Sequence, residues 1–466
     1  MFIKFIKIFL IIILYQTPLY SKSKSLSEID LKYISNYFSG IVAYENQNNS
    51  DALKFFRSSK FLINKHSVYL QKYAYSLVLE SKVQIAINEI KMNFNEKKYH
   101  FFDGFILLAL DSLKKNNFKK SRSYLFKAKN HINNDRINEA LYETLDQYLY
   151  VFEKKTISRQ KKNFGDFSFI SETFQNCYLD DLNTESYFLR LINNFENEYS
   201  RYIFFYLNYL IEKKRFEDVK EYTKNLEYLN LTLLLGQGKQ WVEQKEYKNF
   251  NKIFSCKNHN DLIAEFLFLV STLYSSQDDY ERSNYYLKIS NFLNPKFKLN
   301  LSLEAENHYL NENYNSARKV LQKIDKKNQF YHWYQIKKNA QIISKEKNKE
   351  EALKFINYEF DNIEEPNINM IFDIANFNKK VKKYKKAITY YDQIIQKLNK
   401  DSVIYAEVLY RRGGCYERLK QYEKADKDLL NSLKINPDDA YVLNYLAYSW
   451  LERNYKIKEA ITMLEN

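Results

Sequence analysis

EKADKDLLNSLKINPDDAYVLNYLAYSW, residues 423–450, places small and large residues at fixed intervals. Ala425 is followed by Leu429 four residues later and by Pro437 twelve residues later, and Gly413 stands twelve residues before Ala425. Residues three or four apart share one face of an α-helix, and a proline ends a helix because it lacks the N–H group. The stretch therefore predicts two antiparallel helices whose backbones approach at the small residues.

The interval of twelve residues between two small residues recurs along the chain. It separates Gly40 from Ala52, Ala74 from Ala86, Ala305 from Ala317, Ala340 from Ala352 and Ala375 from Ala387. The positions equivalent to Ala425 lie mostly 31 to 38 residues apart, and they are Ala52, Ala86, Ser121, Val219, Phe250, Ser283, Ala317, Ala352, Ala387 and Ala460. A fixed period of this length is typical of helical repeat proteins.

These offsets resemble the tetratricopeptide repeat, a helix–turn–helix unit of about 34 residues. The resemblance covers roughly residues 30–466 and is poor between residues 140 and 215. It implies an all-α solenoid of about a dozen antiparallel helix hairpins. Within the poor stretch, one unit uses Phe174 and Ser186. Another begins near Ala140 and loses its second helix in the charged run EKKTISRQKKN.

The predicted domain organisation has five parts. They are a signal peptide (1–21), a polar linker (22–30), N-terminal repeats (31–150), a charged linker or degenerate repeat (151–170) and a C-terminal repeat array (171–466). The last unit stops before its second helix is complete. We therefore expect either a longer natural chain or self-association through this end, because solenoids need a polar terminal helix.

The N-terminus has the pattern of a bacterial export signal. MFIKFIK supplies Lys4 and Lys7, an apolar core runs from Ile8 to Tyr15, and a polar run follows Ser21. A core of eight residues is far shorter than the ~20 that span a bilayer. We expect cleavage near Ser21 and a periplasmic or envelope-associated protein, with an uncleaved membrane anchor as the alternative.

The cysteines and histidines indicate neither a metal nor a cofactor. The three cysteines (Cys177, Cys256 and Cys415) are widely spaced, and the six histidines are scattered outside any zinc motif. One cysteine pair could close in an oxidising compartment, but a disulfide framework is excluded. The sequence also lacks the motifs of a nucleophile or a catalytic carboxylate pair. We therefore predict that the chain is not an enzyme and binds no cofactor.

The stretch LLLGQGKQW, residues 233–241, could be mistaken for a phosphate-binding loop. Gly236 and Gly238 are too close together for that motif, and Gln240 stands where Ser or Thr should coordinate magnesium. Gly238 also lies twelve residues before Phe250, in the small-residue position of a repeat. We interpret it as a packing glycine and expect alanine to be tolerated there.

A net charge of +15 is spread along the chain, so nucleic acid binding is not expected. One run, KKVKKYKK, is denser and falls at the turn between two helices. It defines a basic edge of Lys379, Lys380, Lys382, Lys383, Lys385 and Lys386. This edge is either a surface for an anionic partner, such as lipid headgroups, or a set of solvated lysines.

The resemblance also implies where a partner binds, because the first helix of each unit lines the concave groove. The candidate groove residues are Phe372, Asn376, Tyr410, Tyr441, Asn444 and Tyr448. They combine aromatic rings with side-chain amides, a pairing common at protein interfaces. Basic residues are few among these positions, so an acidic tail is not the expected ligand. The alternative is that the tyrosines reflect a chain with 42 of them.

The resulting hypothesis is an envelope scaffold that binds a segment of another protein in this groove. A second hypothesis is an accessory module that acts on envelope glycan or lipid through the basic edge. A third is a regulatory module for an enzyme supplied in trans.

Overall fold

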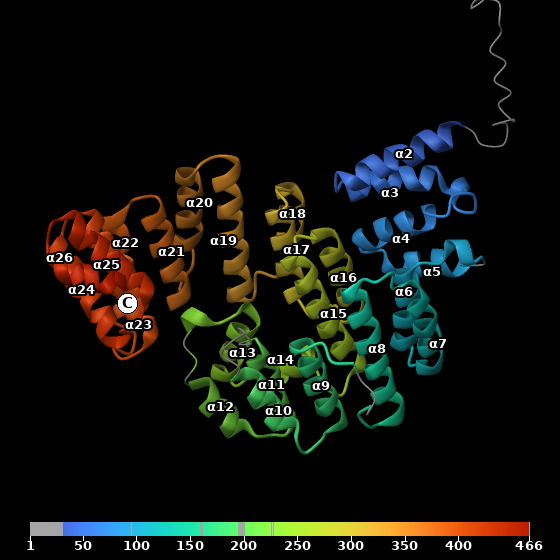
Figure 1. The fold of residues 1–466 in the computed structure, drawn as a ribbon, viewed down its shortest axis with the longest axis horizontal. Helices are drawn as coiled ribbons and strands as arrows, with labels where there is room; N and C mark the ends of the chain where they lie inside the picture. The colour runs from blue at the N-terminus through green and yellow to red at the C-terminus, as the bar shows by residue number, and fades with distance from the viewer. Residues whose placement is uncertain are drawn as a thin grey trace, which may run out of the picture. The chain divides into compact units, whose positions relative to one another are not determined.

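The structure is a computed structural model that describes residues 31–94, 96–158, 162–193, 201–224, 226 and 228–465. All regular secondary structure in these residues is helical (Figure 1). This confirms the predicted all-α class. The predicted signal peptide and polar linker lie outside the described residues. Within the described part, no helix has the length and apolar character needed to cross a membrane.

The chain forms two compact units, one up to Asn133 and the other from Asn134. In the first unit, consecutive helices pack as three hairpins, α2/α3, α4/α5 and α6/α7. Its elements are α2 (Leu31–Glu45), α3 (Asn49–Ser58), η1 (Lys60–Leu62), α4 (Tyr69–Leu79), α5 (Val83–Asn93), η2 (Lys97–Tyr99), α6 (Phe102–Lys114), α7 (Phe118–Ala128) and η3 (Lys129–His131).

The second unit begins with a long helix, α8, that is not part of a two-helix hairpin, and it ends with six consecutive hairpins, α15/α16 to α25/α26. Its elements are α8 (Arg136–Lys154), α9 (Asp166–Leu179), α10 (Thr184–Ile192), α11 (Tyr202–Glu212), α12 (Phe216–Lys224), η4 (Tyr228–Asn230), α13 (Leu233–Glu243), α14 (Lys248–Ile253), α15 (His259–Ser276), α16 (Tyr280–Leu293), α17 (Leu299–Leu310), α18 (Tyr314–Leu321), α19 (Gln329–Glu346), α20 (Lys349–Asp361), α21 (Ile368–Lys380), α22 (Tyr384–Ile395), α23 (Val403–Arg418), α24 (Tyr422–Ile435), α25 (Ala440–Glu452) and α26 (Ile457–Glu465).

The predicted small-residue contacts hold the hairpins together. Ala425 and the ten positions equivalent to it are all at most 1% exposed. A Cβ atom on Gly413 would lie 3.3 Å from the carbonyl oxygen of Ala425, so these two helices approach closely, as predicted. The prolines also end helices as predicted, since α16 and α24 stop two residues before Pro295 and Pro437.

The same tight turn joins the two helices of most hairpins. In α23/α24, Lys420 adopts a left-handed conformation with φ 59°, and the N–H of Gln421 donates to the carbonyl of Tyr416 at 2.9 Å. Equivalent left-handed residues are Gln47, Ser81, Asn116, Lys214, Lys245, Asp278, Glu312, Lys382 and Asn454. Glycine usually occupies this position, because it carries no Cβ penalty there. A chain with 7 glycines makes the turn with polar residues instead.

Helices α9 to α14 lie between α8 and α15 in the chain, and α15 then packs back against α8. The predicted unit near Ala140 is α8 alone, because the next described helix, α9, begins only at Asp166. Helix α15 packs against α8 and α9, with the rings of Tyr148 and Phe266 5.8 Å apart. Helices α9 and α10 pack as a hairpin, as predicted, and Phe174 on α9 is buried. Ser186 on α10 is exposed, so the prediction that it is a packing residue of this hairpin is wrong.

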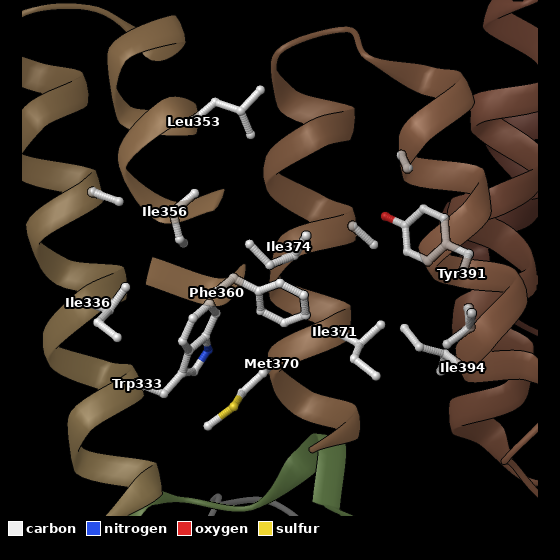
Figure 2. Packing of buried hydrophobic residues seen from close by; sticks show 14 of the residues in the cluster. Trp333, Ile336, Leu353, Ile356, Phe360, Met370, Ile371, Ile374, Tyr391 and Ile394 are labelled. Atoms are coloured by element: carbon white, nitrogen blue, oxygen red, sulfur yellow. The ribbon is translucent and has the colours of Figure 1, made fainter. Parts of the chain in front are cut away.

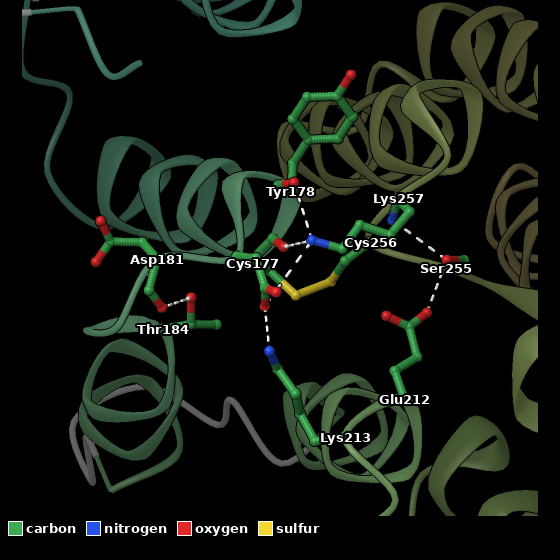
Figure 3. Close-up of polar contacts among 10 residues, drawn as sticks. Cys177, Tyr178, Asp181, Thr184, Glu212, Lys213, Ser255, Cys256 and Lys257 are labelled. Atoms are coloured by element: carbon green, nitrogen blue, oxygen red, sulfur yellow. Dashed lines mark hydrogen bonds and ion pairs between the residues drawn. A yellow bond between two sulfur atoms is a disulfide. The ribbon is translucent and has the colours of Figure 1, made fainter. Parts of the chain in front are cut away.

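A disulfide links the two ends of the α9–α14 segment, which we call the α9–α14 excursion. It joins Cys177, near the end of α9, to Cys256, just before α15, across 79 residues (Figure 3). Lys257, the residue after Cys256, also contacts the end of α9 and donates to the carbonyl oxygen of Tyr178 at 3.2 Å. Cations stabilise the C-terminal end of a helix, where carbonyl groups lack partners. The third cysteine, Cys415, is free and buried.

One hydrophobic cluster spans the neighbouring hairpins from α19 to α23. Figure 2 shows Trp333 of α19, Phe360 of α20 and Met370 of α21 converging in one cluster. The rings of Trp333 and Phe360 lie 5.9 Å apart, edge to face. The first helices α19, α21 and α23 are thereby fixed side by side, which positions the residues of the candidate site.

Candidate partner-binding surface

The six predicted groove residues all lie on first helices of their hairpins. Phe372 and Asn376 belong to α21, Tyr410 belongs to α23, and Tyr441, Asn444 and Tyr448 belong to α25. We call the surface formed by these six side chains the first-helix face.

Arg411 connects α23 to α21 on this face, and the sequence analysis did not single it out. Its guanidinium lies 5.2 Å from the ring centre of Phe372, and Nη1 lies 3.4 Å from Oδ1 of Asn376. The same amide oxygen accepts a hydrogen bond from the hydroxyl of Tyr391 at 2.7 Å. Asn376 is therefore held in place by two neighbours rather than free to reorient.

Tyr445 connects α25 to α23. Its ring meets that of Tyr410 edge to face at 5.8 Å, and its hydroxyl donates to Oε2 of Glu417 at 3.0 Å. Burial and the neighbouring Glu417 carboxylate raise the pKa of Tyr445. Tyr445 therefore stays a neutral donor at neutral pH and links the two helices.

The tyrosines of α25 differ from these because they face solvent. Tyr441 is 80% exposed and Tyr448 is 60% exposed, and Asn444 between them is exposed as well. They stand at positions i, i+3 and i+7, which form one stripe on a helix. They are not part of the core, so their substitution tests binding rather than folding.

The predicted basic edge divides into two parts. Lys380, Lys382, Lys383, Lys385 and Lys386 are exposed around the turn between α21 and α22, as predicted. Lys379 differs from them, because it is half-buried and its ammonium lies 5.6 Å from the ring centre of Tyr410. Lys379 therefore lies against the first-helix face rather than on the edge, because its position on α21 turns it towards Tyr410 of α23.

A small cavity of about 250 Å³ lies between the N-terminal ends of α19 and α21 and the start of α13. Trp333, Tyr334 and Met370 line one side, and Leu231 and Leu233 line the other. Nearby, Tyr228 stacks on Phe330 at 5.9 Å. This part of α19 and α21 is thus covered by the α9–α14 excursion.

The glycine–lysine stretch at residues 233–241 is helical throughout, within α13. The ammonium of Lys239 donates to the backbone carbonyls of Thr223 and Leu226 at 3.1 and 2.6 Å. Lys239 is buried and completes the end of α12, so it is not available to a phosphate. The interpretation of Gly238 as a packing position is consistent with this placement, since it faces Phe204 and Phe250.

Elsewhere in the second unit, charged groups are buried in pairs. Arg201 and Glu265 form an ion pair of 2.5 Å, and burial raises the pKa of Glu265 to about 7. Lys288 and Glu304 form another of 2.6 Å. No group of three metal-ligating side chains occurs in the described part of the chain.

Residues 406–439, which include most of α23 and all of α24, match the tetratricopeptide repeat family. The APC/C hetero-tetramer Cut9-Hcn1 shares 16% identity over 94% of this chain and 87% of that chain, with a TM-score of 0.35. Yeast Tom70 shares 12% identity over 93% of this chain and 99% of that chain, with a TM-score of 0.35. No curated protein matches the chain in sequence.

The fold and this surface define an all-α protein built from repeated helix hairpins. Residues 406–439 match one tetratricopeptide repeat, and the other hairpins bury the residues equivalent to Ala425 in the same way, so the chain contains such a repeat within an array of helix hairpins. The two structural neighbours, at their low TM-scores, add nothing to that assignment.

Proposed function

We propose that this chain is an exported scaffold that binds a segment of another protein on the first-helix face. One observation carries the proposal, namely that Tyr441 and Tyr448 are 80% and 60% exposed on the same stripe of α25. Exposed tyrosines supply apolar contact area and a hydrogen-bonding hydroxyl, and they are enriched at protein interfaces. In this proposal the chain acts by binding, and its glycine–lysine stretch serves helix packing rather than phosphate binding.

The test is the double substitution Tyr441→Ala with Tyr448→Ala. Tyr358→Ala on α20 is the matched control, because Tyr358 is 69% exposed on a second helix. Crosslinked partners are quantified from envelope extracts, and circular dichroism checks the fold. We expect the double variant to lose a partner that wild type and Tyr358→Ala retain. An unchanged partner profile with retained helicity would remove this face as the binding site.

Export is the second part of the proposal. It is supported by the charged start and short apolar core of residues 1–21, and by the buried Cys177–Cys256 disulfide. Disulfides of this kind persist in oxidising compartments and are rare in the cytosol. We expect the mature protein to begin near residue 22 and to fractionate with the periplasm or envelope. Intact Met1 on a cytosolic protein with reduced cysteines would contradict export.

The alternative function acts through the basic edge. Lys382, Lys385 and the other three exposed lysines form no ion pair within the described residues, which favours contact with an anionic glycan or lipid. The test is sedimentation with anionic vesicles. Lys382→Glu with Lys385→Glu should abolish binding, and Lys424→Glu with Lys427→Glu on α24 is the control. Equal loss in both variants would indicate only the overall positive charge.

A further inference from the structure

The positive charge of the chain is concentrated in its first unit. Residues 31–133 contain 17 lysines and arginines against 7 aspartates and glutamates, a net charge of +10. Residues 134–466 contain 51 against 48, a net charge of +3. The first unit therefore carries most of the total of +15, although the sequence analysis treated that charge as spread along the chain.

Helix α7 and the turn before it carry the densest part of this charge. Residues 112–134 contain seven lysines and arginines and no aspartate or glutamate. The acid that precedes them, Asp111, is 2% exposed and pairs with Lys91 at 2.5 Å and with Lys115 at 2.8 Å. The charge of Asp111 is therefore already balanced, and α7 contains no carboxylate to balance its own lysines.

One side of α7 combines lysines with an exposed aromatic ring. Leu125 is buried and turns the opposite side of the helix towards the core. Lys119, Lys120 and Lys127 are exposed, and none of the three forms an ion pair within the described residues. Phe126 is 69% exposed and follows Lys119 by seven residues, so the two share one side of the helix. We call the surface formed by Phe126 and the three lysines the α7 face.

The preceding hairpin adds apolar side chains on the same side. Ile85 and Met92 of α5 occupy the positions of the repeat that Lys120 and Lys127 occupy in α7. They are 43% and 59% exposed. Exposed lysines together with exposed apolar side chains suit a partner that is anionic at its surface and apolar beneath it.

We propose that the α7 face binds the surface of an anionic phospholipid bilayer. The three lysines contact the lipid phosphates, and the ring of Phe126 enters the boundary between headgroups and acyl chains. A nucleic acid duplex would satisfy the lysines but leave the ring of Phe126 in water, so a bilayer accounts for more of the surface. The α7 face belongs neither to the first-helix face nor to the basic edge, and the inference therefore does not rest on the proposed function.

The test is sedimentation of residues 22–466 with phosphatidylcholine vesicles that contain or lack phosphatidylglycerol. This chain includes all the described residues but not the apolar stretch 8–15, which could enter a bilayer by itself. Each lysine near an anionic surface contributes about fivefold in affinity, so Lys119→Glu with Lys120→Glu should weaken binding to anionic vesicles about tenfold or more. Lys424→Glu with Lys427→Glu on α24 makes the same change of charge and should weaken it less than about threefold.

Phe126→Ser tests the apolar part of the α7 face without a change of charge. Removal of an inserted ring should weaken binding to anionic vesicles about fivefold or more. Phe38→Ser on α2 is the matched control and should change binding less than about twofold, because Phe38 is 60% exposed on a helix with a single lysine. Substitution of exposed side chains should leave Tm nearly unchanged, and Lys119→Gln with Lys120→Gln repeats the charge test with a milder change.

Three results would overturn the proposal directly, namely equal binding to vesicles with and without phosphatidylglycerol, equal weakening by the two lysine pairs, and unchanged binding by Phe126→Ser. Loss of binding in Lys382→Glu with Lys385→Glu, with normal binding by the α7 variants, would assign lipid binding to the basic edge instead. Binding of a double-stranded oligonucleotide that depends on Lys119 and Lys120, without binding to vesicles, would reassign the α7 face to nucleic acid.

Discussion

Gly238 lies in the middle of α13, and the rings of Phe204 and Phe250 pack against the position that a Cβ atom would take. A Cβ atom there would come within 2.9 Å of Phe204 and 3.1 Å of Phe250, and these rings stack on each other at 4.9 Å. Overpacking costs about 1–3 kcal/mol, while alanine gains about 1 kcal/mol over glycine in a helix. We therefore expect Gly238→Ala to lower the free energy of unfolding by about 1 kcal/mol in urea titrations, contrary to the sequence-based expectation that alanine is tolerated.

The control for this substitution is a Phe204→Leu background. Leucine removes the ring that the new Cβ would meet most closely. In that background, Gly238→Ala should be neutral or stabilising, which a double-mutant cycle measures as a favourable coupling. If alanine destabilises both backgrounds equally, the cost does not come from the ring.

The side-chain spacing predicted the buried small residues well, because each depends only on neighbours within one hairpin. The sequence analysis assigned Lys379 to the basic edge, whereas the structure places it over the ring of Tyr410. Lys379 follows Asn376 by three residues and Phe372 by seven, so helical periodicity alone places it on their face. Its membership of a dense lysine run concealed this. Arg411 follows Tyr410 by one residue, which helical periodicity does not place on the same face. Its contact with Asn376 joins two repeats and has no local signal.

The left-handed turn that recurs between paired helices predicts how a glycine substitution changes stability. Lys420 holds φ 59° between α23 and α24 and is exposed. A residue with a Cβ atom pays about 1 kcal/mol in this region, and glycine does not. We expect Lys420→Gly to raise the free energy of unfolding by roughly 0.5–1 kcal/mol, measured by thermal melts.

Lys424→Gly, four residues later within α24, is the matched control. It removes the same side chain from a helix interior, where glycine costs about 1 kcal/mol. The two substitutions should therefore change Tm in opposite directions. Destabilisation by both would mean that the turn imposes no strain on Lys420.

The first turn of α15 carries a pH-sensitive carboxyl group. Burial raises the pKa of Asp261 to about 6, although the N–H of Ser255 donates to its Oδ2 at 3.1 Å and acts in the opposite direction. A raised carboxyl pKa means that the folded state retains the proton longer than the unfolded state. The contribution of Asp261 to stability is therefore complete below about pH 4 and is lost as pH rises through 6.

Asp261→Asn isolates this effect, because the amide oxygen can still accept from Ser255. We expect wild type to lose roughly 1–3 kcal/mol relative to Asp261→Asn between pH 4 and pH 7. Chemical denaturation across this range measures the difference. A constant difference between the two proteins would show that Asp261 titrates normally.

The hairpins could be predicted from sequence because their contacts are local, but the excursion of α9 to α14 could not. Gly236 of α13 faces Phe330 of α19, and no periodicity links residues so far apart. The sequence analysis recognised that one cysteine pair could close, and left open which one. The structure joins Cys177 to Cys256, because α15 returns to α9.

For the whole molecule, the disulfide should be a large single source of stability. It closes a loop of 79 residues, for which the loss of chain entropy in the unfolded state predicts about 4 kcal/mol. We expect Cys177→Ser with Cys256→Ser to lower the free energy of unfolding by about 2–5 kcal/mol, and reductant to lower the Tm of wild type but not of this variant. The unfolded, unreduced protein should expose one reactive thiol, Cys415. Three thiols before reduction would contradict the pairing.

The boundary between the two compact units predicts which fragments of the chain fold on their own. The compact units separate after Asn133, whereas the sequence analysis placed the change in residues 151–170. A fragment of residues 134–466 keeps Asp135, which caps α8 by accepting from the N–H of Ile137 at 2.9 Å and pairs with Arg282 at 3.1 Å.

A fragment of residues 171–466 instead loses α8 and the start of α9. It would uncover Phe266, which is 2% exposed and packs against Tyr148 and Phe167. Exposing several aromatic side chains costs about 1.5–3 kcal/mol each. We expect the 134–466 fragment to be monomeric and helical, with a cooperative melt, and the 171–466 fragment to melt lower or aggregate. Circular dichroism and size-exclusion chromatography compare the two. Equal stability of both fragments would place the true boundary in the charged stretch, and α8 would then be dispensable to the second unit.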